Sequence, residues 1–518
     1  MSFVEKFDAF AEIDGSSAFV KWTERAAFVF MLLMIAAAPH SIAATQTAWV
    51  IGSLFLIARF FAKPRVRTKF TRIDAALWAF FGWSVVTSLT SYAPDISIDK
   101  LRGVIIFLIF YLVIIQLRNR RSAYLAAFLL IGSCMVNVVW TPIERLIGRG
   151  VEIHGLAPNG PLAKANFKDG DTLLEANGKR LRTLDEAAAA VEANDTTSLK
   201  FYRPDYEWSY DVKRADLLSA PDALGKLGVE SWTKSRNWRS RGFYNHYTTY
   251  AEALQLIASL LFGFAVASLR KNRDEEDDDA KPFMRFVRTP FLLACVAAFG
   301  LALLLTVTRA SQLSFMISAA LIILLGAGRK WIWRAALIGI PVVLLGLFFV
   351  QQSRHVGFFD TNDDSIKWRE TVWAEGFDLW TKSARNFTVG VGMDSKNRFA
   401  KEWHLFDDGR LNAGHFHSTP LQLVVERGLP ALIIWLGLLW FYGRDLLKAL
   451  ALAKRRGNVL DVGILLGCFG GMIGFFTSGL IHYNLGDTEV AMIFYMLMGI
   501  GVYTARNFIA APDVHQNT

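Results

Sequence analysis

The sequence predicts an all-α protein that crosses a membrane many times. Of its 518 residues, 53% are hydrophobic and 13% aromatic, which is too apolar for an ordinary soluble protein. The apolar residues also fall into about twelve runs, each near the roughly 20 residues that a helix needs to cross the hydrocarbon core. These runs are 25–44, 46–63, 74–92, 101–117, 122–141, 247–269, 289–307, 310–327, 332–351, 419–441, 459–482 and 488–506.

The basic residues gather in alternate connections between these runs. The connections begin at Pro64, Arg118, Arg270, Gly328 and Gly443. Because cytoplasmic loops are enriched in Lys and Arg, we expect both termini in the cytoplasm. The net charge of +10 is therefore explained by basic residues in the cytoplasmic connections, so membrane lipids are expected as partners and nucleic acid is not.

Two long polar segments then lie on the outer side and divide the chain. We expect N-terminal transmembrane helices, an outer segment, further transmembrane helices, a large outer loop and a final group of transmembrane helices. In that order the domains are 1–141, 142–246, 247–351, 352–418 and 419–518. Cys134, Cys295 and Cys468 all lie within apolar runs, which indicates buried thiols and no disulfide framework.

Residues 155–203 have the pattern of a small α+β domain inside the first outer segment. Strand-like pieces alternate with the turn signals PNG, KDGD and NGK, and a helix-like stretch follows a cap at Thr183. The segment resembles a PDZ domain over about 151–215, with 161–165 similar to its short first helix and 184–194 to its groove helix. The stretch EIHGLAP departs from the glycine-rich carboxylate loop of that family. A purely structural insert therefore remains an alternative to a groove that binds a peptide or protein end by strand addition.

Three stretches place an ionisable group where an apolar run meets the outer face. Arg241 and His246 lie in RGFYNHYTTYAEAL, Arg309 lies in the tight turn of LLLTVTRASQLSF, and His417 lies in GHFHSTPLQLVVERG. An arginine at a bilayer costs free energy and usually has a partner, although snorkelling to lipid phosphates is an alternative. Two guanidinium groups at one depth match the oxygens of a diphosphate.

In order, these stretches resemble the O-antigen ligase and O-antigen polymerase superfamily, membrane glycosyltransferases of the GT-C type. The likeness spans about 238–440, and Ser418 stands where the family usually has asparagine. The matching residues are Arg241, Gly242, His246, Thr308, Arg309, Ala310, Trp373, Gly390, Gly392, His417, Ser418, Leu421, Glu426 and Gly428.

The resemblance implies transfer of a glycan from undecaprenyl diphosphate to an acceptor hydroxyl, with inversion and without nucleotide, metal or other cofactor. The site would face the periplasm from a bacterial inner membrane, and the acceptor would be lipid A core or another envelope hydroxyl. Arg241 and Arg309 would bind the diphosphate, and His417 would be the catalytic base. His246, Arg369 and Ser418 are additional candidates.

Other interpretations stay open. A polymerase would use the same donor, and a lipid-linked glycan transporter or a scaffold would form no bond. His415 and His417 suit a metal pair poorly, because a catalytic zinc generally needs three protein ligands. His415 is expected to be a solvated neighbour of His417.

Overall fold

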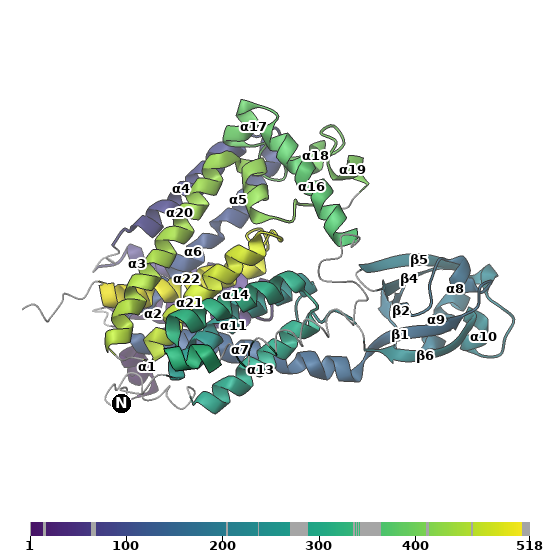
Figure 1. The fold of residues 1–518 in the computed structure, drawn as a ribbon, viewed down its shortest axis with the longest axis horizontal. Helices are drawn as coiled ribbons and strands as arrows, with labels where there is room; N and C mark the ends of the chain where they lie inside the picture. The colour runs from purple at the N-terminus through teal and green to yellow at the C-terminus, as the bar shows by residue number, and fades with distance from the viewer. Residues whose placement is uncertain are drawn as a thin grey trace, which may run out of the picture. The chain divides into compact units, whose positions relative to one another are not determined.

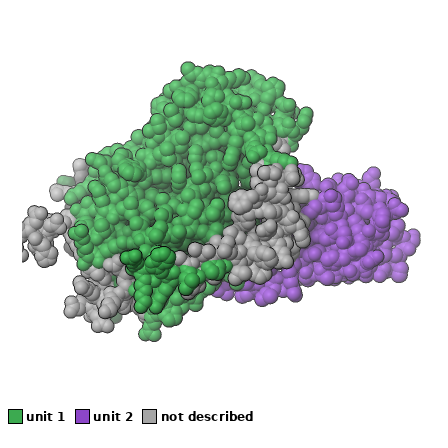
Figure 2. Space-filling view, viewed as in Figure 1, with its two compact units in different colours: residues 1–138, 241–518 green, residues 139–240 purple. Residues whose placement is uncertain are grey.

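The computed structural model shows a largely helical chain interrupted by one α+β unit (Figure 1). The chain divides into two compact units, residues 1–138 with 241–518 and residues 139–240 (Figure 2). Each unit is described by itself. The structure describes residues 2–13, 17–63, 69–203, 206–236, 238–269, 288–334, 337, 339, 341, 364–410, 414–456 and 459–509.

The first helices begin at polar caps. Ser17, Ser41 and Thr71 each accept a hydrogen bond from a backbone N–H in the first turn that follows, which satisfies one of the free amides of that turn. The elements are α1 (Phe3–Ala11), α2 (Ala18–Ala37), α3 (Ile42–Phe60), α4 (Arg72–Leu89), α5 (Pro94–Val104), η1 (Ile105–Phe107), α6 (Leu108–Gln116) and α7 (Arg120–Ile147). The expected single run at 25–44 is wrong in detail, because α2 ends before Pro39 and α3 begins after Ser41.

The later helices form the rest of the first unit. They are α11 (Tyr247–Ser268), α13 (Thr289–Leu305), α14 (Arg309–Gly326), α16 (Asp364–Thr381), α17 (Ala384–Val389), α18 (Ser395–Phe399), α19 (Phe406–Gly409), α20 (Thr419–Arg456), α21 (Val459–Gly479) and α22 (Thr488–Ile509). Glycines bring α11 and α21 together. A Cβ at Gly263 would lie 2.4 Å from the backbone of both Gly463 and Gly467. Small residues of this kind let membrane helices approach closely.

Seven of the described helices are long and apolar enough to cross a membrane: α3, α7, α11, α14, α20, α21 and α22. The apolar helix α13 is shorter, with 17 residues. These helices fit a polytopic membrane protein, as the composition predicted. The count of twelve spans stays a prediction, and most of the expected run at 332–351 lies outside the described residues.

Helix α20 differs from the single span expected at 419–441. It has 38 residues and is broken at Gly428, which has φ 73° and ψ 175°, with Pro430 just beyond. That backbone conformation is nearly restricted to glycine, and proline has no N–H to continue the helical ladder. The nine residues Thr419–Arg427 are therefore a short helix of their own before the long segment that follows.

The second unit is an antiparallel sheet with strand order β5-β4-β2-β1-β6, and β3 pairs with β2. Its core packs α9 against the sheet, with Leu184, Ala187 and Val191 buried. Its elements are β1 (Arg149–Leu156), α8 (Pro161–Lys164), β2 (Thr172–Ala176), β3 (Lys179–Arg180), α9 (Leu184–Ala193), β4 (Thr196–Arg203), β5 (Tyr206–Lys213), η2 (Arg214–Asp216), α10 (Ala223–Leu227) and β6 (Val229–Ser235). The PDZ resemblance of this α+β unit stays a prediction.

Candidate functional site

The loop that precedes α20 holds two histidines on either side of a fixed peptide. Phe416 is fully buried, its N–H donates to Gln422 Oε1 at 2.9 Å, and its carbonyl accepts from Trp373 Nε1 at 2.9 Å. Both polar groups of this residue are thus satisfied by side chains of other elements. His415 and His417 flank Phe416, so their backbone positions are set from both α16 and α20.

His417 lies in a half-buried aromatic setting. Its backbone has φ 48°, its N–H donates to His415 Nδ1 at 3.2 Å, and the centroids of the two imidazole rings are 3.9 Å apart. The indole of Trp368 packs edge-on against the His417 ring, with centroids 4.4 Å apart. His415 is half-buried too, which corrects the expectation of a solvated loop histidine.

Burial is the main cause that lowers the pKa of His417 to about 2, and His415 and Arg369 lower it further. Burial also lowers the pKa of His415 to about 4. A desolvated imidazole loses most of the solvation that would stabilise its charged form. Both pKa values lie well below the ordinary histidine value near 6.5, so both rings are neutral at pH 7.

Several of the other candidates lie around the same loop. His246 and Arg369 both act electrostatically on His417, and so does His482 of the α21–α22 connection. His246 is the N-cap of α11, where its Nδ1 accepts from the Thr248 N–H at 3.2 Å. Ser418 is buried and directly precedes α20. Its carbonyl accepts the first hydrogen bond of that helix, from the Gln422 N–H at 2.9 Å.

Arg241 and Arg309, the two arginines expected to bind the diphosphate, lie on different segments of the chain. Arg241 lies in the turn before α11, where its Nη1 donates to the Asn245 carbonyl at 3.3 Å. Arg309 is the first residue of α14. Neither is among the side chains that most strongly act on His417. Their joint contact with a diphosphate stays a prediction.

A buried lysine that sequence reasoning missed supports the histidine loop. Lys396 is 1% exposed, and its Nζ lies 2.9 Å from both Asp394 Oδ1 and Glu426 Oε1. The same Glu426 oxygen accepts from Gln422 Nε2 at 2.7 Å, and Gln422 Oε1 holds the Phe416 N–H. A continuous hydrogen-bonded path therefore joins Lys396 to the loop.

The charges in this path stabilise one another. Although burial opposes a charged Lys396 most strongly, the Glu426 and Asp394 carboxylates raise its pKa above the ordinary value. Burial similarly opposes the charged form of Asp394, but Lys396 and Lys100 hold its pKa below the ordinary value. The sequence carried no sign of this lysine, because an isolated lysine in an outer loop is usually solvated.

We expect Lys396→Met to lower the free energy of unfolding by about 3–5 kcal/mol, because it leaves the buried carboxylate of Glu426 without its cation. Thermal unfolding of the purified protein measures this. Lys401→Met is the matched control, since Lys401 is exposed in the same outer loop. Equal unfolding temperatures for the two variants would contradict the structural role of Lys396.

Gly390 and Gly392, the glycine pair of the sequence pattern, lie against the backbone of α20 just before its break at Gly428. The N–H groups of Val391 and Gly392 donate to the carbonyls of Val425 and Glu426 at 2.8 and 2.9 Å. Gly390 has φ 71°, and a Cβ there would lie 2.4 Å from the backbone nitrogen of Arg427. Glycine is needed because the two backbones lie too close for a side chain.

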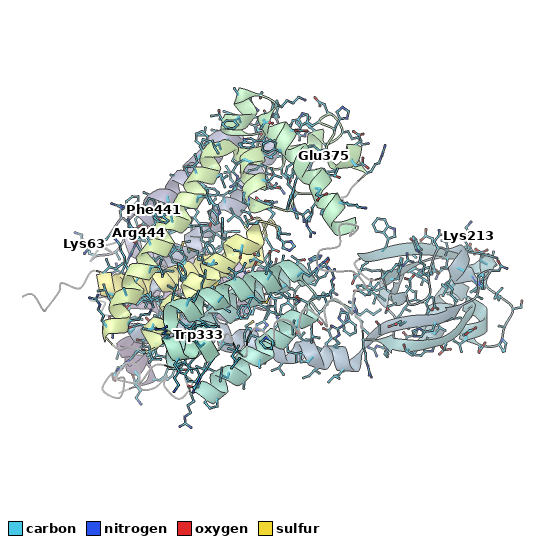
Figure 3. All side chains as sticks on the ribbon, viewed as in Figure 1. Lys63, Lys213, Trp333, Glu375, Phe441 and Arg444 are labelled. Carbon is cyan, nitrogen blue, oxygen red and sulfur yellow. The ribbon has the colours of Figure 1, made fainter. Side chains whose placement is uncertain are left out.

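Another carboxylate fixes the turn after α18. Glu375 of α16 accepts the backbone N–H groups of Phe406 and Asp407 at 2.5 and 3.0 Å (Figure 3). Phe406 and Asp407 both have positive φ, at 58° and 51°. Glu375 therefore holds an otherwise strained turn against the helix that also carries Arg369 and Trp373.

Buried acidic groups also lie near the N-terminal ends of α11 and α22. Glu252 is 2% exposed, and Asp487 acts on it electrostatically. Thr249 Oγ1 donates to Asp487 Oδ2 at 2.6 Å. A single acidic residue inside an apolar run was a visible signal for Glu252, and it was missed. No group of three or more His, Cys, Asp or Glu within the described ranges is arranged to hold a metal ion.

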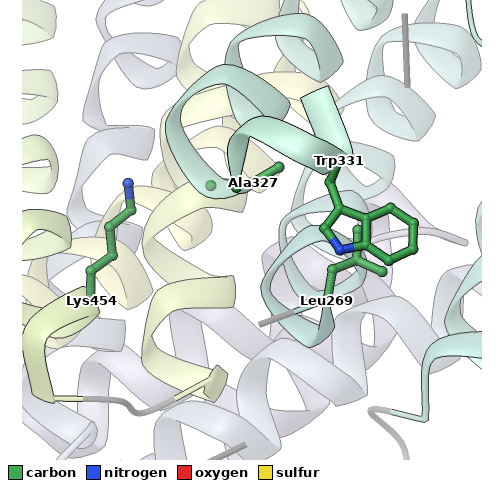
Figure 4. A pocket seen from close by; sticks show the side chains of 6 residues that line it. Leu269, Ala327, Trp331 and Lys454 are labelled. Atoms are coloured by element: carbon green, nitrogen blue, oxygen red, sulfur yellow. The ribbon is translucent and has the colours of Figure 1, made fainter. Parts of the chain in front are cut away.

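A cavity of about 350 Å³ lies at the opposite ends of the helices (Figure 4). It is lined by Leu269, Gly326, Ala327, Gly328, Trp331 and Lys454. Lys454 Nζ donates to the Leu325 carbonyl near the C-terminal end of α14. Lys454 lies near the C-terminal end of α20, whereas the histidine loop precedes the first residue of α20, so the cavity is separate from the histidine loop.

The stability of the loop should depend on pH. Both histidines have lowered pKa values in the folded protein, so the unfolded chain takes up protons first, from about pH 6.5 downward. We expect the unfolding temperature to be highest above pH 6.5 and to fall steadily towards pH 4. In His415→Asn the unfolding temperature should fall less between pH 6.5 and pH 4 than in the wild type. His404→Asn, at an exposed histidine, should behave like the wild type. An identical pH dependence of the unfolding temperature for wild type and His415→Asn would contradict the lowered pKa of His415 in the folded protein.

The fold defines a polytopic membrane protein with a structured histidine loop at the start of a broken helix. Residues 293–436 match the family model Wzy_C, described as O-Antigen ligase. This match over residues 293–436 supports the likeness to the O-antigen ligase superfamily that the motifs predicted. The match includes Arg309, Arg369 and His417, whereas Arg241 and His246 precede it.

A second similarity is short. Over 88 residues the chain is 32% identical to the magnetosome formation protease MamE of Paramagnetospirillum magneticum (strain ATCC 700264 / AMB-1). The similarity covers 16% of this chain and 11% of that protein. It therefore carries no conclusion about activity.

Proposed function

We propose that this protein transfers a glycan from undecaprenyl diphosphate to an acceptor hydroxyl on the periplasmic face of a bacterial inner membrane. The family indicates activity of the O-antigen ligase or polymerase type. The observation that most strongly supports this proposal is the fixed histidine loop. Hydrogen bonds from two elements hold Phe416, and the neutral ring of His417 lies next to it in the chain. A neutral imidazole has a free nitrogen lone pair, which a proton acceptor requires.

In the proposed reaction, the acceptor oxygen attacks the anomeric carbon as the bond from that carbon to the diphosphate oxygen breaks. The electron pair of the broken bond stays on the leaving undecaprenyl diphosphate. Arg241 and Arg309 bind the diphosphate and stabilise this charge. The proton of the acceptor hydroxyl goes to His417, and attack opposite the leaving group inverts the sugar. No metal or other cofactor takes part in this scheme.

The low pKa of His417 has a consequence for this step. A base with a pKa of about 2 has little affinity for a proton in the empty site. The negative charge that grows on the nearby diphosphate raises that affinity as the reaction proceeds. His246 and Arg369 lie within electrostatic range of His417 and are proposed to orient the donor.

We propose a ligase in preference to a polymerase, with lipid A core or another envelope hydroxyl as acceptor. A deletion strain tests this through its surface glycan. A lost ligase leaves finished polymer on undecaprenyl diphosphate, whereas a lost polymerase leaves single units on the core. Movement of the lipid-linked glycan with no bond formed by the purified protein would instead identify a transporter.

The second unit is proposed to hold a peptide or protein end near the membrane, by analogy with PDZ domains. Strands β5 and β6 end the path of paired strands in its sheet, and such an edge strand can pair with an extended chain. Deleting 151–215 and comparing transfer to lipid and protein acceptors tests this role. Unchanged transfer to both acceptors would exclude it.

A further inference from the structure

Arg427 is a buried arginine whose backbone is fixed at the break in α20. It is 5% exposed and directly precedes Gly428. Its carbonyl accepts from Trp83 Nε1 at 2.8 Å, and its guanidinium carbon lies 5.2 Å from the ring centroid of Phe80. Two residues of α4 therefore hold this arginine by its backbone and by one face of its guanidinium group.

Arg427 has no anionic partner among the residues that the structure describes. Its Nε is buried and makes no hydrogen bond to any described group. The neighbouring carboxylate, Glu426, is instead engaged by Lys396, Gln422 and the Asp394 N–H. A buried guanidinium without a counter-ion is costly, and cation–π contact with one phenylalanine offsets only a small part of that cost.

Two tyrosine hydroxyls lie within the electrostatic range of Arg427. Its charge acts on both Tyr483 and Tyr495. Burial raises the pKa of Tyr483 to about 12, so its hydroxyl keeps its proton at pH 7 and can donate it in a hydrogen bond. The Tyr483 ring centroid lies 5.9 Å from that of His415. Tyr483 therefore lies near the histidine loop and within electrostatic range of Arg427.

We propose that Arg427, together with Tyr483 and Tyr495, binds a phosphoryl group of the lipid-linked donor. This inference rests on the proposed function for the identity of that donor. A guanidinium fork binds two phosphate oxygens at once, and phenolic hydroxyls supply further donors to the same group. Arg427 lies at the end of the short helix Thr419–Arg427 that follows the histidine loop, and it adds a third arginine to the two that the motifs assign.

Binding of undecaprenyl diphosphate to the purified full-length protein in nanodiscs tests this site without any acceptor. Arg427→Gln should weaken the affinity about ten- to a hundredfold, since it removes charge-assisted hydrogen bonds. It should leave the affinity for undecaprenol, which lacks phosphate, unchanged. Arg427→Lys should restore part of the affinity. The matched control is Arg444→Gln on the same helix, because Arg444 already pairs with Asp445 at 2.9 Å (Figure 3).

The unfolding temperature without ligand separates this role from a structural one. Arg427→Gln removes an unpaired buried charge, so it should keep or raise that temperature while losing the stabilisation given by undecaprenyl diphosphate. A lower temperature with unchanged affinity would overturn the proposal. Tyr483→Phe with Tyr495→Phe gives a second test, with an affinity about tenfold weaker expected and wild-type affinity contradicting it.

The source of the phosphate is tested by competition. Vesicles of phosphatidylglycerol should not displace undecaprenyl diphosphate at equal concentration, and displacement would reassign the site to phospholipid headgroups. Failure of the proposed function gives a different result. If the protein bound undecaprenyl diphosphate through Arg427 but formed no glycosidic bond, the binding site would stand and the transferase assignment would fall.

Discussion

Replacing His417 by alanine is expected to lower the kcat of glycan transfer about a hundred- to ten-thousandfold, the usual contribution of a positioned general base. The substitution removes the imidazole that lies 4.4 Å, between ring centroids, from Trp368. The loop itself should persist, because Phe416 is held through its own backbone by Trp373 and Gln422. Transfer by the purified protein from a glycan on undecaprenyl diphosphate measures the effect.

The matched control is His404→Ala, at an exposed histidine of the same outer loop that contacts Asp408 at 2.7 Å. This variant should transfer at the wild-type rate. Donor binding should also be nearly unchanged in His417→Ala, since a base acts on the acceptor proton. Normal transfer by His417→Ala would remove the base assignment and leave the fold and the family unaffected.

Replacing Gly428 by alanine is expected to prevent stable folding of the outer loop against α20. A Cβ at Gly428 would lie 1.9 Å from the carbonyl oxygen of Thr388, which is far inside any contact distance. The backbone at φ 73° and ψ 175° is itself strained by about 1–3 kcal/mol for a residue with a side chain. We expect a marked fall in the unfolding temperature and in the yield of folded protein.

Gly437→Ala provides the control on the same helix. Gly437 has helical geometry, and a Cβ there meets no atom within 4 Å. Alanine favours a helix over glycine by about 0.5–1 kcal/mol, so this variant should be as stable as wild type or slightly more stable. Similar unfolding temperatures for the two alanine variants would show that the break at Gly428 is not required.

The helices could largely be predicted from the sequence, because apolar runs near membrane thickness leave few other structures for the chain. The break in α20 could not be placed in the same way. GLP at 428–430 signals a local interruption, but the reason for it is the approach of Thr388, 40 residues earlier. Such contacts between distant segments depend on the tertiary fold and leave no periodic pattern.

The candidate site was predicted in part. The order of the motifs predicts His417 as the reactive histidine, and that role stays a prediction. The structure places His246 and Arg369 within electrostatic range of it. The ionisation of His417 could not be predicted, because its low pKa arises from burial under Trp368 and beside His415. The burial of Lys396 was missed for the same reason, since its partner Glu426 lies on α20, 30 residues later in the sequence.

The short helix Thr419–Arg427 sets the distance between the histidine loop and the break at Gly428. Its nine residues rise about 13 Å and fix the angle between the two ends. Inserting or deleting one residue here would rotate Glu426 and Arg427 by about 100° relative to His417. The hydrogen-bonded path from Phe416 through Gln422 and Glu426 to Lys396 would then be interrupted, even with every side chain retained. The number of residues between the histidine and the glycine is therefore constrained by helical geometry, independently of the chemistry of the residues between them.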